Sequence, residues 1–103
     1  MNTHSTQLVA LLSKDLSLTE DESSGLQTDD HALLATRLKQ LVAYLLDHDF
    51  NRLINACYRM DISETKLKEA LNTAEPDRVP EEIANLILVR QQQKVQMRLK
   101  YST

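Results

Sequence analysis

The chain has very little of the residues that punctuate a β-rich fold. Among 103 residues there are one glycine, two prolines, one phenylalanine, three tyrosines and no tryptophan. A sandwich or barrel of short strands needs more turn residues than Gly25, Pro76 and Pro80 supply. Abundant Leu, Ala, Glu, Gln and Lys favour helices instead. The composition therefore predicts an all-α protein whose core is aliphatic.

Other scarcities exclude whole classes of protein. A single cysteine, Cys57, excludes an intrachain disulfide framework. The longest apolar run covers residues 41–46 and is far shorter than a membrane span. The N-terminus lacks the basic-then-apolar order of a secretory signal, and one glycine cannot build a glycine-rich phosphate loop. We expect a cytoplasmic protein without a bound cofactor.

The sequence offers little catalytic or metal-binding chemistry. Cys57 falls on the apolar stripe of its helix, beside Ile54 and Tyr58, which favours a buried structural thiol over a nucleophile. Asp47-His-Asp49 carries metal-capable groups, but three adjacent residues point in different directions and cannot close a site alone. Helix capping and solvent exposure account for them better than a metal site does. We therefore expect no catalytic, cofactor-binding or metal-binding residues, and a protein that is not an enzyme.

Apolar residues recur at three- and four-residue spacing in four segments, which predicts helices over 29–47, 50–60, 63–72 and 80–101. Either Asp61 or Ser63 can cap the third helix, and Pro80 suits the first position of the last one. The last helix is the longest. The predicted core consists of Leu34, Leu38, Leu41, Val42, Leu45, Phe50, Leu53, Ile54, Cys57, Leu67, Leu71, Ile83, Leu86 and Ile87.

The first 28 residues look least like part of this bundle. Residues 1–30 contain six acidic side chains and one basic one, a net charge of −5. Residues 7–14 are compatible with a short helix, whereas 17–27 have the polar, acidic composition of a flexible linker. The predicted organisation is an acidic N-terminal segment, 1–28, followed by a helical domain, 29–103. The fold would be a small bundle of four to five helices with a long C-terminal helix.

The second half of the last predicted helix is basic. Residues 83–103 contain four basic side chains and no acidic one, a net charge of +4. Apolar residues thin out after Arg90, so this half is expected to project beyond the core as a contact surface. The candidate partner-binding residues are Arg90, Lys94, Val95, Arg98 and Leu99. Changing Val95 and Leu99 to Asp should then abolish association while leaving the thermal unfolding of the rest of the helical domain nearly unchanged. We therefore predict a protein–protein interaction or assembly module. A homodimer formed through this helix is one possible arrangement.

An alternative comes from the segment that joins the second and third predicted helices. Asp61-Ile-Ser-Glu-Thr-Lys-Leu67, after the helix over 50–60, resembles the turn and early recognition helix of a helix-turn-helix. Asp61 stands where the motif usually has glycine. Acidic residues at 64 and 69 would repel phosphates, and the domain lacks a basic footprint. In this interpretation the protein is a small DNA-associated regulator, and Thr65, Lys66 and Lys68 face the nucleic acid.

A broader resemblance covers residues 38–101. Tyr58-Arg-Met-Asp-Ile-Ser-Glu64, then Lys66-Leu67, then Ile83-Ala-Asn-Leu-Ile-Leu-Val-Arg-Gln-Gln-Gln-Lys94, are similar to a group of short, uncharacterised bacterial helical proteins. The resemblance implies a small all-α cytoplasmic protein. It supplies no activity and no ligand.

Overall fold

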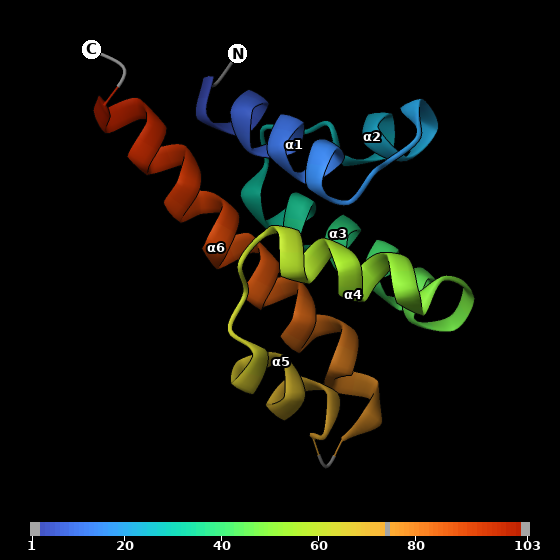
Figure 1. The fold of residues 1–103 in the computed structure, drawn as a ribbon. Helices are drawn as coiled ribbons and strands as arrows, with labels where there is room; N and C mark the ends of the chain where they lie inside the picture. Colours follow the sequence, from blue (N-terminus) through green and yellow to red (C-terminus); the bar gives the residue numbers. More distant parts are fainter. Residues whose placement is uncertain (1–2, 74, 102–103) are drawn as a thin grey trace.

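Six α-helices and one short 3-10 turn form the part of the chain that the structure, a computed structural model, describes: residues 3–73 and 75–101 (Figure 1). No strand occurs within those residues, and the expectation of an all-α fold with a long C-terminal helix is confirmed. The elements in order are α1 (Thr3–Asp15), α2 (Glu20–Leu26), α3 (His31–His48), α4 (Phe50–Arg59), α5 (Glu64–Leu71), the 3-10 turn η1 (Pro76–Arg78) and α6 (Val79–Tyr101).

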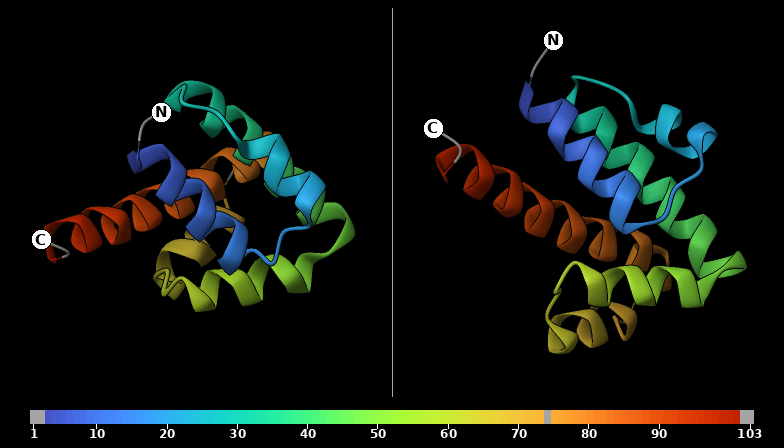
Figure 2. Two further views of the ribbon diagram at one scale, coloured as in Figure 1. Left: turned by 90° about the horizontal axis from the view of Figure 1, so that it is seen from above. Right: turned by 45° about the horizontal axis from the view of Figure 1, so that its top comes forward.

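Three helices, α1, α3 and α5, pack on the long helix α6. Its 23 residues correspond to about 35 Å at 1.5 Å per residue, most of the longest molecular dimension of 43 Å. Helix α3 makes the most extensive contact with it, α5 packs on its N-terminal half and α1 on its C-terminal half. Figure 2 shows that α1 and α6 run in opposite directions, so that the start of α1 and the end of α6 lie toward the same end of the molecule. Helix α4 packs on α3.

The core is aliphatic, as the composition predicts. Nine of the predicted core positions are fully buried: Leu34, Leu38, Val42, Leu45, Leu53, Cys57, Leu67, Ile83 and Ile87. Leu41, Ile54, Leu71 and Leu86 are half-buried at its edge. Phe50 is the exception at 45% exposed, and Tyr58, on the same predicted stripe, is 58% exposed. Phe50 opens the first turn of α4, so the expectation that its side chain is part of the core is wrong.

The N-terminal residues belong to the same core. Leu8 and Leu12 of α1 are fully buried, and so are Leu16, which directly follows α1, and Leu26 of α2. Helix α1 is longer than the sequence suggests, and α2 occupies most of the stretch expected to be a linker. A capping box explains α2: the Thr19 hydroxyl accepts a hydrogen bond from the Glu22 backbone N–H, and the Glu22 carboxylate accepts one from the Thr19 N–H.

The C-terminal end of α1 is closed by its own backbone and by two arginines of α4. Ser17 adopts a left-handed conformation with φ of 55°, and the Leu18 N–H donates to the Ser13 carbonyl, as in a Schellman motif. Arg52 Nε donates to the Leu16 carbonyl at 3.0 Å, and Arg59 Nη1 donates to the Ser17 hydroxyl at 2.9 Å. Guanidinium groups at this end also complement the helix dipole. These contacts join α1 to α4. Helix α4 lies within the predicted helical domain, 29–103, so the N-terminal segment is bound to that domain by hydrogen bonds as well as by apolar packing.

The end of α4 has the same construction. Asp61 has φ of 61°, its N–H donates to the Tyr58 carbonyl, and the Ile62 N–H donates to the Cys57 carbonyl. Asp61 therefore terminates α4. Ser63 is the N-cap of α5, because its hydroxyl accepts a hydrogen bond from the Lys66 N–H. Of the two caps the sequence allows, the structure selects Ser63.

Candidate functional site: the groove between α5 and α6

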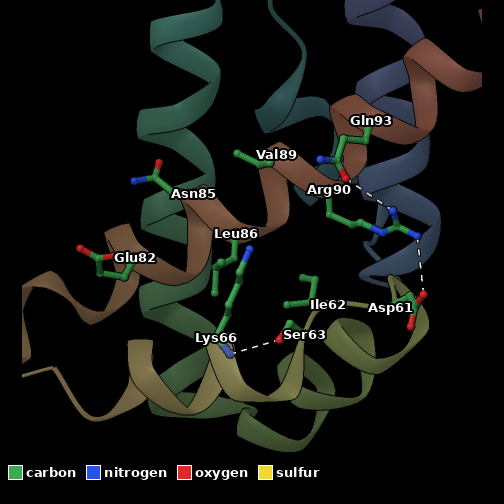
Figure 3. A pocket seen from close by; sticks show the side chains of 10 residues that line it. All are labelled: Asp61, Ile62, Ser63, Lys66, Glu82, Asn85, Leu86, Val89, Arg90 and Gln93. Atoms are coloured by element: carbon green, nitrogen blue, oxygen red, sulfur yellow. Dashed lines mark hydrogen bonds and ion pairs between the residues drawn. The ribbon is translucent and has the colours of Figure 1, made fainter.

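A groove of about 460 Å³ runs between the start of α5 and the middle of α6 (Figure 3). The Schellman turn after α4 closes one end of it, since Asp61, Ile62 and Ser63 are among its lining residues. A second hollow of about 470 Å³ continues along the same two helices and shares Lys66, Glu82 and Leu86 with the first. The residues that line the first hollow are Asp61, Ile62, Ser63, Lys66, Glu82, Asn85, Leu86, Val89, Arg90 and Gln93.

The floor of the groove is apolar. Ile62 is buried and Leu86 is half-buried, but Val89 is 55% exposed. Figure 3 shows Ile62 and Leu86 on facing sides of the hollow, with Val89 farther along α6. Helical geometry places Leu86 and Val89 three residues apart on one side of α6. The groove therefore presents a short aliphatic surface that no described residue covers fully.

Charged groups surround this floor, and several of them are already engaged. Arg90 Nε donates to the Met60 carbonyl at 3.0 Å, and its Nη2 lies 3.6 Å from Asp61 Oδ2. Glu82 Oε1 lies 3.5 Å from Arg78 Nη2. The Lys66 side chain extends beside Leu86 in Figure 3, and its ammonium forms no ion pair with a described residue. Lys66 is therefore the cation of this groove that is most available to a partner.

The five candidate partner-binding residues differ in exposure and do not form one free surface. Val95 is 0% exposed, because α1 packs on this part of α6. An aspartate at this position would disrupt the core, so the expectation that it leaves the rest of the helical domain intact is wrong. Lys94 Nζ lies 3.7 Å from Asp15 Oδ2, and Arg90 Nε donates to the Met60 carbonyl at the end of α4. Only Arg98 and Leu99 are exposed. The basic half of α6 is therefore docked on α1 at least as far as Val95.

A buried polar residue that the sequence did not single out joins α1 and α6. Gln91 is fully buried, and its Nε2 donates to Asp15 Oδ2 at 2.9 Å. The same carboxylate oxygen faces the Lys94 ammonium. A run of three glutamines, 91–93, gives no hint that the first lies inside. The signal that could have been used is position, since Gln91 falls four residues after Ile87 and four before Val95, on the buried face.

The candidate nucleic-acid-binding residues lie together on α5. Thr65, Lys66 and Lys68 are all exposed. Lys68 Nζ lies 3.5 Å from Glu64 Oε1, so an acidic neighbour offsets one of the two lysines. Helix α5 packs mainly on α6 and makes much less contact with α4. The α4–α5 pair therefore lacks the mutual packing that supports a recognition helix.

The remaining chemical candidates have structural roles. Cys57 is buried, and burial raises the pKa of its thiol to about 11, which disfavours the nucleophilic thiolate. The Asp49 carboxylate accepts a hydrogen bond from the Arg52 N–H and caps α4. No cluster of three or more potential metal ligands occurs within residues 3–73 and 75–101. In the same residues, none of the helices combines the length and the apolar character that crossing a membrane requires.

Comparison of the chain with protein-family models, with curated proteins and with solved structures found no match.

Proposed function

We propose that this protein is a non-enzymatic interaction module that binds a protein partner through the groove between α5 and α6. The observation that carries the proposal is Val89, a largely exposed aliphatic side chain in the apolar floor that it forms with Ile62 and Leu86. Exposed apolar groups that line a hollow with a polar rim are typical of partner-binding surfaces.

The shape of the groove supports a helical or extended segment as its occupant. Two hollows of similar size follow one another along α5 and α6 and share Lys66, Glu82 and Leu86. An elongated apolar floor between two helices suits an amphipathic helix whose apolar face enters the groove. The exposed Lys66 ammonium would favour an acidic residue beside that apolar face.

The test compares a substitution in the groove with a matched one elsewhere. Val89→Asp adds a charge to the groove floor, whereas Asn55→Asp adds the same charge on the exposed side of α4. Each variant and the wild type would be used to capture partners from a native lysate, with and without nuclease, and read by mass spectrometry. We expect nuclease-resistant partners that the wild type and Asn55→Asp retain and that Val89→Asp loses. Equal capture by all three proteins would refute the proposal.

The alternative function is that of a small DNA-associated regulator acting through α5. The exposure of Thr65, Lys66 and Lys68 is compatible with it, and the packing of α5 on α6 argues against a helix-turn-helix arrangement. It requires duplex binding that weakens steeply with salt and is lost on Lys66→Glu with Lys68→Glu. Partners that disappear with nuclease in the capture experiment would favour this alternative over the groove.

A further inference from the structure

The structure places unpaired acidic and basic side chains at opposite ends of α1. Glu20 and Asp21, on the first turn of α2, form what we name the acidic end. Arg98 and Lys100, on the last turn of α6, form the basic end. All four side chains are exposed. None of the four forms an ion pair with another described residue, although the Lys100 ammonium lies 5.8 Å from the centre of the Tyr101 ring.

The two ends are too far apart to neutralise each other within one molecule. Helix α2 contacts the C-terminal part of α1, where the Ser13 and Ser23 hydroxyls are 2.7 Å apart. The end of α6 and the start of α1 lie toward the same end of the molecule in every view (Figures 1 and 2). The 13 residues of α1 therefore separate the two ends by about 20 Å. Screening at physiological salt acts over about 8 Å, so each end is free to attract an opposite charge from outside.

We infer that two copies of this chain associate about a two-fold axis, with the basic end of each copy against the acidic end of the other. The inference rests on the proposed role as an interaction module and names a second copy as one partner. A two-fold axis uses the same surface of both copies, so the two complementary contacts form at once and the assembly closes as a dimer. Met97 and Tyr101 are largely exposed beside Arg98 and Lys100, and they supply apolar area to bury in the contact.

Complementarity within one chain is the reason for choosing a second copy over another partner. Ion pairs within the molecule already engage Glu22, Asp15, Lys94 and Arg90. The four side chains of the acidic and basic ends are exposed and outside those pairs, so each copy carries both a surface and its counterpart. An antiparallel arrangement of the two α1 helices brings each acidic end opposite a basic end at the matching separation. Opposite potentials meeting across an interface raise the rate of encounter and set its orientation.

A charge-swap experiment tests this arrangement. One variant carries Arg98→Glu with Lys100→Glu, and the other carries Glu20→Lys with Asp21→Lys. Each variant alone would place like charges at both contacts, so its dimer should dissociate at least about tenfold more readily than the wild type. In an equimolar mixture both contacts are complementary again, and a heterodimer of the two variants should form. Sedimentation velocity and native mass spectrometry would distinguish these species.

Two controls keep the outcome interpretable. Lys39→Glu with Lys68→Glu changes the net charge as much as Arg98→Glu with Lys100→Glu, at exposed positions on α3 and α5, and should leave the dimer unchanged. Acidic residues favour the start of a helix, so lysines there weaken α2. Glu20→Gln with Asp21→Asn therefore serves as a milder second variant, which should weaken the dimer without reversing the charge.

The inference fails if the wild type is monomeric at high micromolar concentration and low salt. It also fails if a wild-type dimer is insensitive to both charge reversals, or if the mixed variants do not associate. A different outcome would assign the basic end to another partner. In that case the wild type is monomeric, and Arg98→Glu with Lys100→Glu abolishes its binding to an acidic protein, a nucleic acid or anionic vesicles. Capture through Val89 is independent of all these results, so the groove proposal can stand when the dimer fails.

Discussion

Leu12→Ala tests whether α1 is an integral part of the fold. Leu12 is fully buried in α1, and α1 packs on both α2 and α6. Truncating a buried leucine costs about 2–5 kcal/mol, through lost transfer free energy and the cavity left behind. A single domain of this size is stable by only about 5–15 kcal/mol. The substitution should therefore remove a large share of the free energy of unfolding of the whole chain.

Urea unfolding followed by circular dichroism at the helix band measures this effect. We expect one transition in both proteins, with the midpoint of Leu12→Ala shifted to lower urea and the slope unchanged. The melting temperature should fall by about 4–8 °C for each kcal/mol lost. Leu33→Ala is the matched control, because Leu33 is 39% exposed on α3 and its truncation leaves no cavity. A separate early transition, or equal midpoints for Leu12→Ala and the wild type, would refute the reasoning and make α1 an independent appendage.

Three further predictions concern single side chains. Asp61→Gly should raise the free energy of unfolding by roughly 1 kcal/mol, because a left-handed φ of 61° is unfavourable for a residue with a Cβ; chemical denaturation should show the opposite change for Asp61→Ala. The pKa of the Glu22 carboxyl lies below its usual 4.5. The main cause is the 2.7 Å hydrogen bond that Arg52 donates to it, and the second is the hydrogen bond from the Thr19 backbone N–H. The Glu22 carboxylate therefore stabilises the fold above pH 4.5, and this contribution is lost as the pH falls through the folded-state pKa. Between pH 4.5 and that pKa, the melting temperature should fall less in Arg52→Met than in the wild type. Cys57 should resist a thiol reagent at mildly alkaline pH in the native protein and react fully in urea, because its buried thiol has a pKa of about 11; rapid native labelling would contradict its burial.

The helices that carry a strong apolar stripe could be predicted from the sequence. Helices α3 and α4 begin and end within two residues of the expected bounds, because their apolar spacing and capping residues agree with each other. Helix α2 was missed because only Leu26 of its seven residues is buried, so it has no stripe to detect. Its signal was the capping box from Thr19 to Glu22, which lies within an acidic run that also fits a linker.

The groove and the arginine contacts could not be predicted, because they depend on which helices meet. The consecutive apolar residues Leu86, Ile87, Leu88 and Val89 cannot all face one core, so the sequence does imply that one of them is exposed. It does not indicate that Val89 is the exposed one or that α5 forms the opposite wall. Arg52 likewise reaches the Leu16 carbonyl across 36 positions of sequence, a contact that no local pattern encodes.

The pairing of α1 with α6 has a consequence for how the chain folds as it is made. The hydrogen bond between Asp15 and Gln91 spans 76 positions, so α1 emerges from the ribosome long before the helix on which it packs. Until then its leucines have no native partner on α6, and exposed apolar surface of this kind invites aggregation. Contacts so distant in sequence also slow the closure of a fold. A nascent or prematurely terminated chain that lacks Val95 should therefore depend on chaperones more than the small size of this bundle suggests.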